Sequence, residues 1–566
     1  MTYYNTPVSR RKERIARAVE QALYAARNAG TLDFTHIPAF TVETPREAAH
    51  GDFATNAAML MSKAARQNPR AIAEAIAAHF DMKAAGVGAL EIAGPGFINF
   101  RMPTGWHSDL LAEILAQGEN FGHSDAGAGR KIQVEFVSAN PTGELHMGNA
   151  RGAAIGDSLA SLLGMAGFDC QREYYINDAG NQIEKFGFSL EARYLQALGE
   201  EVDFPEDGYH GEDLPLLMAE LTREIGDKFR ALAPQQRREK LIAYALGRKL
   251  ADIRAALENF GVSYDVWFSE QSLHESGAVR DVIGELRRGG WLLEKDNALW
   301  LDCGRFGEEK PEVLVRGNGM PTYYAADIAY HQDKFNRGFE TVIDIWGADH
   351  HGHVARMQGA MEALGYRREQ LEVILMQFVR LYQGGEILKM SKRTGTYVTL
   401  NELVQEVGRD AARFIFVMRS ADNLIDFDLD LAKQQTAENP VYYVQYAHAR
   451  ICSIIRMAED AGYSLPQQPL EAAQLSLLTH ESEQALIRRL ADFPDEVIIA
   501  ALQREPHRIA VYVQEAAALF HNFYNHCRVL DDDNAMFAAR ISLARATATA
   551  LAKGLNALGV SAPQRM

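Results

Sequence analysis

The chain has 566 residues, 47% of them hydrophobic, and a formal net charge of −17 at pH 7. This length exceeds what one hydrophobic core supports, so we expect three or four domains. No stretch reaches the roughly 18 consecutive apolar residues of a membrane span, and no apolar segment follows the charged N-terminus as in an export signal. We therefore expect a cytoplasmic protein that does not enter a membrane. The acidic charge argues against indiscriminate polyanion binding, because phosphate contacts need local Lys and Arg.

The four cysteines lie far apart and form no CxxC pair. This arrangement disfavours a zinc ribbon, and it predicts four buried thiols.

Residues 1–112 have the pattern of a small α+β unit. The amphipathic segments Arg10–Ala29 and Ile72–Phe80 predict helices. A Gly-Pro-Gly turn predicts that a strand follows at 97–100.

A strand, a loop and a helix come next. KIQVEFV, residues 131–137, alternates with the period of a strand, and the segment after SANPTGELHMGN has an apolar stripe at helical spacing. The first turn of a helix suits a phosphate, because its N–H groups are free and its dipole is positive. Gly143 and Gly148 allow close backbone approach, and His146 offers a donor. An ordinary turn between strand and helix is the alternative.

A strand-rich block runs from 291 to 400. Near its end, GGEILKMSKRTG crowds Lys389, Lys392 and Arg393 on one loop. Three neighbouring cations suit the charge that develops on a reacting phosphate. The alternative is a solvated basic loop.

Within this block, WGADHHGH places Asp349, His350, His351 and His353 together. These residue types can bind zinc. Because no cysteine flanks them and no second ligand cluster is present in the sequence, we predict no resident metal.

Strand signals nearly vanish from about residue 430. Asn439-Pro440 is a typical helix start, and an apolar stripe follows from Val444 to Ala458. Segments 508–529 and 538–558 add further helices to an all-α bundle. We expect the residues after 558 to contribute little to the fold.

The ordered motifs resemble the HIGH and KMSKS signatures of the class I aminoacyl-tRNA synthetases, here His146-Met147-Gly148-Asn149 and Lys389 to Arg393. Over nearly its whole length the chain is similar to the bacterial arginyl-tRNA synthetases. The segments that carry this likeness are HGDFATNAAM, GPGFINF, VEFVSANPTGELHMGNARGAAIGD, YYINDAGNQI, PTYYAADIAYH, WGADHHGH, LKMSKRTG, ENPVYYVQYAHARI and LGVSAPQRM. Asn149 departs from the signature, which often has His there, although an amide can still donate a hydrogen bond.

The resemblance implies an α/β multidomain fold. It implies an N-terminal α+β domain that contacts the tRNA elbow (1–112), a Rossmann-type class I catalytic domain with insertions (113–432) and a helical anticodon-binding domain (433–566). The implied reaction activates L-arginine with ATP to arginyl-adenylate, with Mg²⁺ on the departing pyrophosphate. The arginyl group then passes to the 2′-hydroxyl of the terminal adenosine of tRNA(Arg). We expect a monomer that needs bound tRNA before the first step.

The resemblance also implies roles for individual residues. The catalytic residues that it implies are His146, Asn149, Lys389 and Lys392. ATP contacts fall to Asn140, Pro141, Thr142, Gly143, His146, Gly148, Asn149, Asp349, His350, His353, Met390, Ser391 and Lys392. Arginine contacts fall to Glu135, Asn140, Tyr323 and Asp327. In the bundle, where aromatic faces beside Arg and Asn suit unstacked bases, tRNA contacts fall to Tyr446, Arg450, Asn522 and Met566.

Carboxylates meet the planar guanidinium fork best, which favours Glu135 and Asp327 as ligands. Tyr323 and Asp327 lie four residues apart and would share a helix face. The alternative is that Glu135 is a salt-bridged framework residue and Tyr323 packs in a core. Most of the bundle's aromatic rings are expected in its core.

Two rival functions remain. One is a synthetase for another amino acid or another nucleotidylyltransferase, against which Glu135 and Asp327 argue by disfavouring an apolar substrate. The other is an RNA-binding relative without catalysis, against which the intact His146, Lys389 and Lys392 argue.

Overall fold

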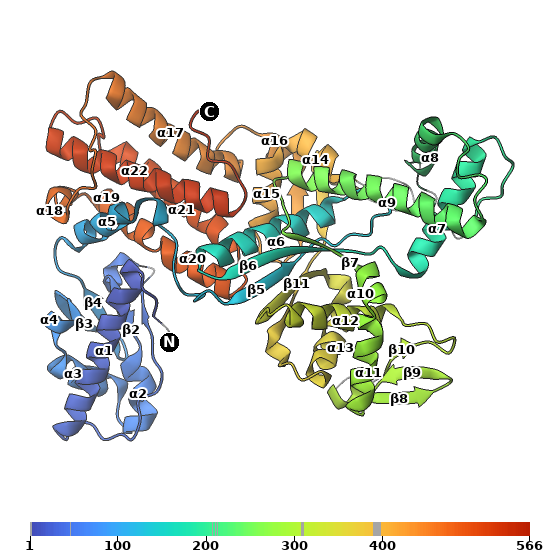
Figure 1. Cartoon of the computed structure of the whole chain (residues 1–566). Helices are drawn as coiled ribbons and strands as arrows, with labels where there is room; N and C mark the ends of the chain where they lie inside the picture. Colours follow the sequence, from blue (N-terminus) through green and yellow to red (C-terminus); the bar gives the residue numbers. More distant parts are fainter. Residues whose placement is uncertain are drawn as a thin grey trace.

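The computed structural model describes residues 3–45, 47–206, 208–209, 211, 213–306, 311–388 and 398–566. Figure 1 shows four parts: an N-terminal unit, a central sheet, insertions at the opposite end, and a helical C-terminal part above the N-terminal unit. Lys389, Met390, Ser391, Lys392 and Arg393 lie outside the described residues.

The N-terminal unit packs helices against a four-stranded antiparallel sheet. Its helices are α1 (Pro7–Asn28), α2 (Ala57–Ala65), α3 (Pro69–His79) and α4 (Met82–Ala85). Its strands, in the order β1-β2-β4-β3, are β1 (Val42–Glu43), β2 (Phe53–Thr55), β3 (Ala89–Ala93) and β4 (Phe97–Arg101). Side-chain caps start two of the helices: Thr6 accepts from the Ser9 amide, and Asn68 accepts from the Arg70 amide. The two helices and the strand predicted here are confirmed to within a few residues.

The central sheet has five parallel strands. In spatial order they are β12 (Leu371–Met376), β11 (Thr341–Gly347), β5 (Lys131–Glu135), β6 (Asp169–Ile176) and β7 (Val266–Ser269). From β5 the chain passes through α6 (Met147–Met165) to β6 on one side, whereas β11 lies on the other side. The strand order therefore reverses between β5 and β11. Ligands bind at such a reversal, beyond the carboxyl ends of the strands.

β5 is buried on both faces, as expected for a central parallel strand. Gln133 and Glu135 are therefore buried along with Ile132 and Val134. The alternating residues of this strand are therefore buried on both faces, instead of being buried on one face and exposed to solvent on the other.

Two insertions interrupt the sheet. The first, between β6 and β7, comprises α7 (Gly180–Ala197), α8 (Asp213–Ile225) and α9 (Pro234–Asn259) around its own small core. The second, between β7 and β11, comprises α10 (Glu270–Ser276), α11 (Ala278–Arg288), the antiparallel strands β8 (Leu292–Lys295), β9 (Ala298–Leu301) and β10 (Glu312–Val315), and α12 (Tyr323–Asn336). Figure 1 shows both insertions projecting from the same end of the molecule.

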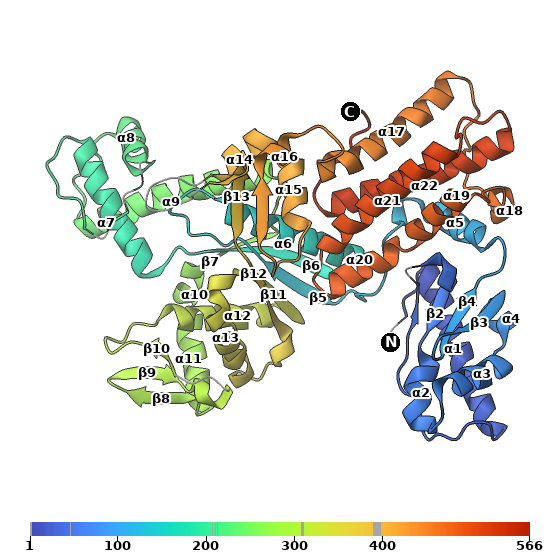
Figure 2. The ribbon, with the colours of Figure 1, turned by 180° about the vertical axis from the view of Figure 1, so that it is seen from behind.

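The remaining elements lead from the sheet to the C-terminal helices. They are α13 (His351–Ala363), β13 (Val379–Gln383), β14 (Glu386–Ile387), α14 (Leu400–Val407), α15 (Arg409–Val417), β15 (Ile425–Asp428) and α16 (Leu429–Lys433). The helical part then consists of α17 (Pro440–Asp460), α18 (Ala472–Leu475), α19 (Glu481–Ala491), α20 (Phe493–Leu502), α21 (His507–His526) and α22 (Asn534–Ala557). It contacts two other parts of the molecule, since α5 (Trp106–Gln117) packs on α19 and α20 packs on α6 (Figure 2).

Cys303 and Cys527 are buried, whereas Cys170 and Cys452 are partly exposed, so the prediction of four buried thiols is wrong for two of them. Among the described residues, no helix has both the length and the apolar character that a membrane crossing needs.

Candidate active site

The loop that leaves β5 has an unusual backbone. Val137 and Ser138 have φ values of +71° and +39°. Such angles are uncommon for a β-branched residue, and they concentrate at functional sites. The Ser138 hydroxyl ties this turn to its neighbours, because it donates to Glu135 Oε1 (2.8 Å) and accepts from the Tyr175 amide of β6 (3.1 Å).

Further along, the signature residues cap α6. His146 Nδ1 accepts from the Gly148 amide (3.1 Å), and Asn149 Oδ1 accepts from the His146 amide (3.0 Å). The second bond uses the amide oxygen, so Nδ2 is the part of Asn149 that can donate to a ligand. A Cβ at Gly148 would lie 3.0 Å from His146 Cε1, so glycine permits this tight start.

A cavity of about 460 Å³ opens where the strand order reverses. It lies between the start of α6 and the ends of β11 and β12. The predicted ATP residues that line this cavity are His146, Gly148, Asn149, Asp349 and His350.

Other predicted ATP residues do not line this cavity. Asn140, Pro141 and Thr142 are absent from its described lining, and the Asn140 amide donates instead to Gln182 Oε1 (3.2 Å). Gly143 lines a separate small cavity beside α9, and His353 lines the amino-acid cavity described next.

A second cavity, of about 250 Å³, adjoins the first. The two share Val137, Ile345, Gly347 and His350. Its polar lining among the described residues consists of Glu135, Ser138, Tyr175, Asn177, Asp327, Tyr330, His331, Trp346, His350 and His353. We call it the amino-acid cavity.

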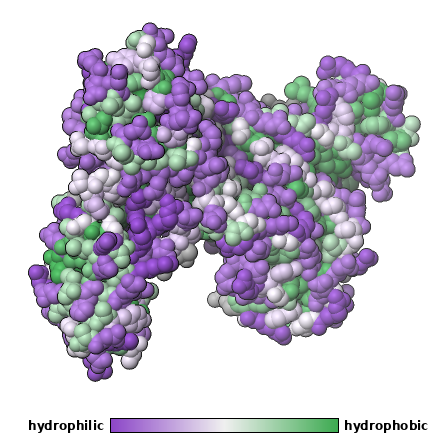
Figure 3. Space-filling view, turned by 60° about the vertical axis from the view of Figure 1, so that its left-hand side comes forward, coloured by the Kyte–Doolittle hydropathy of each residue, from purple (hydrophilic) through white to green (hydrophobic). Residues whose placement is uncertain are grey.

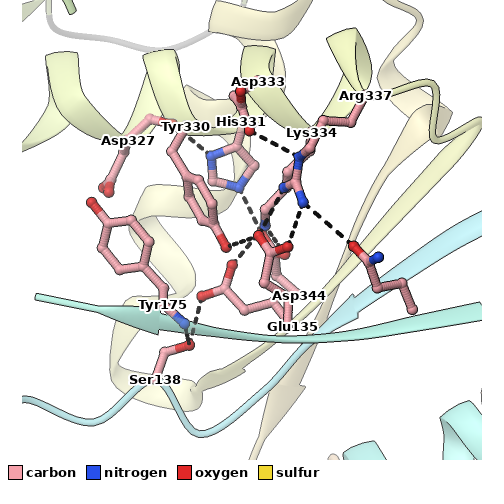
Figure 4. Close-up of polar contacts among 12 residues, drawn as sticks. Glu135, Ser138, Tyr175, Asp327, Tyr330, His331, Asp333, Lys334, Arg337 and Asp344 are labelled. Carbon is pink, nitrogen blue, oxygen red and sulfur yellow. Dashed lines mark hydrogen bonds and ion pairs between the residues drawn. The ribbon is translucent and has the colours of Figure 1, made fainter. Parts of the chain in front are cut away.

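Glu135 lines the amino-acid cavity and is also ion-paired behind it. Its Oε2 accepts from the fully buried Lys334 Nζ (2.6 Å), which donates in turn to Asp344 Oδ1 (2.8 Å) (Figure 4). Burial raises the pKa of the Glu135 carboxyl against the opposing pull of Lys334. These ion-pair contacts fit the alternative in which Glu135 is a salt-bridged framework residue. Glu135 nevertheless lines the amino-acid cavity with one edge of its carboxylate.

The other two predicted arginine residues lie on α12, as expected from their spacing. Asp327 lines the amino-acid cavity, with Oδ2 3.3 Å from His353 Nε2. Tyr323 is 42% exposed and lies against the start of α7, where a Cβ on Gly180 would come within 3.3 Å of its hydroxyl. The structure does not bring Tyr323 into the described lining of the amino-acid cavity.

The sequence analysis missed a buried carboxylate, Glu270. It begins α10 directly after β7, is 2% exposed, and its Oε2 has no hydrogen-bond partner among the described residues. Burial, and then the nearby Asp327, raise the pKa of Glu270 to about 7. The Tyr175 hydroxyl, which also lacks a described partner, interacts with it. Its position after a parallel strand was the available signal, but the short strand β7 was not recognised.

The WGADHHGH residues turn towards different partners. His353 faces Asp327, His351 Nδ1 lies 3.3 Å from the Ala348 carbonyl oxygen, and His350 lies 3.8 Å from Asp349. Across the described part of the chain, no group of three or more His, Cys, Asp or Glu is placed to hold a metal ion.

In the helical part, an exposed aromatic cluster joins α17 and α21. Tyr446 is 41% exposed and stacks on His521, while Arg450 lies 4.4 Å from the centre of the Tyr524 ring. Asn522 is exposed beside them. Phe520 and Phe523 are core residues, as expected for most of these rings.

The expectation that the C-terminal segment contributes little to the fold is wrong for residues 560–564. Val560 is buried, Gln445 donates to the Ser561 carbonyl (2.9 Å) and Arg456 donates to the Gln564 carbonyl (3.2 Å). Short-range sequence patterns miss these bonds, because the partners lie more than 100 residues away. Met566, beyond these anchors, is 52% exposed.

Comparison with known proteins identifies the class first. The family model "tRNA synthetases class I (R), catalytic domain" matches residues 110–456, "Arginyl tRNA synthetase N terminal domain" matches 11–102, and "DALR anticodon binding domain" matches 444–566. The parallel sheet, with a capped loop where its strand order reverses, is the catalytic domain of a class I aminoacyl-tRNA synthetase.

Individual relatives identify the family within this class. The arginine–tRNA ligases of Heliobacterium modesticaldum and Moorella thermoacetica are 59% and 57% identical over 557 and 559 residues, covering 98% and 99% of this chain and 99% and 100% of theirs. The Thermus thermophilus arginyl-tRNA synthetase has the same fold, with a TM-score of 0.73 at 23% identity over 97% of this chain and all of that one. The chain belongs to the arginyl-tRNA synthetases, and the predicted α/β multidomain fold is confirmed.

Proposed function

We propose that arginyl-adenylate forms across the two adjoining cavities, with ATP in the larger one and arginine in the amino-acid cavity. The observation that carries this proposal is that the cavities share four residues where the strand order reverses. One cavity offers a helix N-terminus, which suits phosphates, and the other offers carboxylates, which suit a guanidinium.

In the first step the arginine carboxylate attacks the α-phosphorus of ATP, and the bond to pyrophosphate breaks. His146, Asn149 and the first turn of α6 stabilise the added charge, and Lys389 and Lys392 meet the pyrophosphate. Mg²⁺ enters with the ATP as part of the substrate. Among the described residues that line the larger cavity, Asp349 is the carboxylate that could bind this Mg²⁺, which would neutralise charge on the phosphates.

In the second step the 2′-hydroxyl of the terminal adenosine of tRNA(Arg) attacks the arginyl carbonyl carbon, and AMP leaves. Substrate positioning replaces a covalent protein intermediate in both steps.

Arginine selection follows from the charges around the amino-acid cavity. Asp327 faces it, and Glu270 is a buried carboxylate with an unpaired oxygen beside Asp327. A guanidinium bound to Asp327 lowers the pKa of Glu270 through its charge, because Glu270 lies behind the described lining of this cavity. Glu135 adds a third anion at the edge, already shared with Lys334. A neutral side chain would leave these groups unpaired.

The tRNA is proposed to span the outer parts of the molecule. We propose domain boundaries after residues 112 and 432. The N-terminal unit contacts the tRNA elbow, and the residues at the anticodon are Tyr446, Arg450, Asn522 and Met566. The space-filling view has a hollow between the N-terminal unit and the β8–β10 insertion, with hydrophilic residues on both sides (Figure 3). We further propose a cytoplasmic monomer that requires tRNA before activation.

ATP–pyrophosphate exchange with each amino acid, with and without tRNA, tests the proposal. We expect exchange with arginine when tRNA is present and background rates with other amino acids. Asp327→Asn and Glu135→Gln should each raise the KM for arginine and leave that for ATP nearly unchanged, because each removes an anion facing a guanidinium, a loss of about 2–5 kcal/mol for a desolvated pair. Normal arginine dependence in both variants would show that the pocket assignment is wrong.

A further inference from the structure

Asp344 lies at the centre of the sheet, directly behind the amino-acid cavity. It is fully buried on β11, and its register partner on the neighbouring β5 is Glu135. Two carboxylates side by side repel each other, and burial adds to the cost. Other groups must therefore stabilise the two carboxylates in this buried position.

Lys334 of α12 provides the first compensation. Its fully buried ammonium donates to Asp344 Oδ1 (2.8 Å) and to Glu135 Oε2 (2.6 Å). Although burial acts to raise it, the pKa of Asp344 is lowered to about 2 by Lys334 and His331, so this carboxylate is an anion that only accepts. One oxygen of Asp344 therefore fixes Glu135 through Lys334.

His331 provides the second link. Its Nε2 lies 2.6 Å from Asp344 Oδ2, and its Nδ1 donates to the backbone carbonyl of Asp327 (2.7 Å). Figure 4 shows His331 between Asp344 and the turn of α12 that bears Asp327. The second oxygen of Asp344 therefore fixes the turn that presents Asp327.

We propose that Asp344 is a positioning residue for arginine recognition, holding Glu135 through Lys334 and Asp327 through His331. Asp344 is not among the described residues that line the amino-acid cavity, whereas both residues that it holds are. The inference rests on the proposed arginine pocket and assigns a role to a residue that does not touch the substrate. Two separate carboxylates must meet one planar fork, so their spacing decides how well it binds.

Glu173 is a matched control for Asp344. It is also fully buried, and it lies on β6 as the other register partner of Glu135. Its carboxylate accepts from Arg337 (2.6 and 2.8 Å) and from the Tyr330 hydroxyl (2.7 Å), and not from Lys334 or His331. A glutamine at this position removes the ion pair with Arg337, keeps an oxygen that can accept from the Tyr330 hydroxyl of the cavity, and leaves the links to Glu135 and Asp327 in place.

The test compares Asp344→Asn with Glu173→Gln in tRNA charging. An asparagine carries no negative charge and has one accepting oxygen, so both ion pairs are lost and only one of Lys334 and His331 can still donate to it. We expect Asp344→Asn to raise the KM for arginine by roughly tenfold to a hundredfold, with the KM for ATP within about twofold. Glu173→Gln should lower the thermal stability comparably and leave the arginine KM unchanged. Equal arginine KM values at equal stability would overturn the inference.

A charge-neutral double variant covers the case in which Asp344→Asn does not fold. Asp344→Asn with Lys334→Met removes one anion and one cation together, so the net charge of the buried cluster stays the same, while Glu135 loses its ammonium partner and keeps Ser138. It should fold and still bind arginine weakly, and a normal arginine KM in this folded variant would contradict the proposal.

A double-mutant cycle separates this inference from the pocket assignment. If Asp344 acts through Asp327 and Glu135, then Asp344→Asn adds little to the arginine KM of the double variant Asp327→Asn/Glu135→Gln, because effects that share a route are not additive. Fully additive effects would overturn the inference. If Asp327→Asn and Glu135→Gln themselves leave the arginine KM normal, the pocket assignment fails instead.

Discussion

Buried carboxylates around the amino-acid cavity differ in what they contact. Glu135 and Asp344 share the ammonium of Lys334, whereas Glu270 keeps one oxygen without a partner among the described residues. A buried anion without a cation costs stability unless it takes a proton, which is why the pKa of Glu270 is raised to about 7. We propose that a cationic substrate near Glu270 relieves this cost.

Glu270→Gln tests this at the level of one residue. A folded pKa of about 7 against an ordinary 4.5 means that the native state holds the proton more tightly. Stability is then lost as the pH rises from about 4.5 through 7, by at most about 3 kcal/mol. The variant should remove this loss, melting above the wild type at pH 8 and close to it at pH 4.5, while its KM for arginine rises. Thermal unfolding at the two pH values and arginine-dependent charging measure both effects. An unchanged difference between the two melting temperatures would contradict the assignment.

Lys392→Ala tests the cationic loop, which the sequence motif alone identifies. We expect the loop to meet charge that grows during adenylate formation, so turnover should fall far more than ground-state ATP binding weakens. Single-turnover adenylate formation and equilibrium ATP binding separate the two quantities. Unchanged turnover with weakened ATP binding would indicate a simple substrate clamp.

Among the elements, the C-terminal segment behaves differently in its two halves. Residues 560–564 are fastened to α17 by backbone carbonyls, whereas Arg565 and Met566 extend past the last anchor at Gln564. We propose that residues 560–564 have a structural role and that Arg565 and Met566 bind the tRNA. Met566 offers a flexible thioether that can pack under an unstacked base.

Deleting Arg565 and Met566 should leave the melting temperature almost unchanged, because the anchors remain. Charging of the full tRNA should weaken, and the preference among anticodon variants should flatten. Removing residues 561–566 is the comparison, since it breaks the anchors and should lower the melting temperature. The hypothesis fails if the shorter deletion leaves the ratio of charging between wild-type and anticodon-mutated tRNA unchanged.

Across the whole molecule, one buried arginine joins three parts of the chain. Arg413 of α15 is fully buried and binds Asp157 of α6 (2.5 Å) and the carbonyls of Leu558 (3.0 Å) and Phe260 (3.2 Å). A Cβ at Gly559 would lie 2.1 Å from its guanidinium, so glycine is required where the chain leaves α22. The helix that begins at His146 is thus tied to the end of the helical part.

Arg413→Met should lower the free energy of unfolding by about 3–5 kcal/mol, because it leaves Asp157 Oδ2 and several buried carbonyls without their partner, although Arg172 still pairs with Asp157 Oδ1. Arg380→Met is the comparison: its pair with Asp426 is half-exposed, so this variant should change the free energy of unfolding far less. Denaturant unfolding of both variants measures the difference. A loss below 1 kcal/mol at Arg413 would contradict the role of this tie.

Local features of the sequence predicted much of the fold and the reaction. Helix caps, apolar stripes and the capped loop at His146 depend on residues within a few positions of one another, so the order of residues alone determines them. The chain of motifs from HGDFATNAAM to LGVSAPQRM likewise identified the family. His146 and Asn149 line the larger cavity and Asp327 lines the amino-acid cavity.

The tertiary structure alone decided which charges meet. Lys334 pairs with Glu135 across 199 positions and Arg413 with Asp157 across 256, and no periodicity in the sequence records such a pairing. The same holds for Glu270, whose short strand β7 gives almost no pattern, and for the anchored residues 560–564. Whether a carboxylate serves a substrate or the framework depends on which cation is nearest after burial, because desolvation strengthens every electrostatic interaction around it. That choice is made only when strands and helices distant in the chain come together.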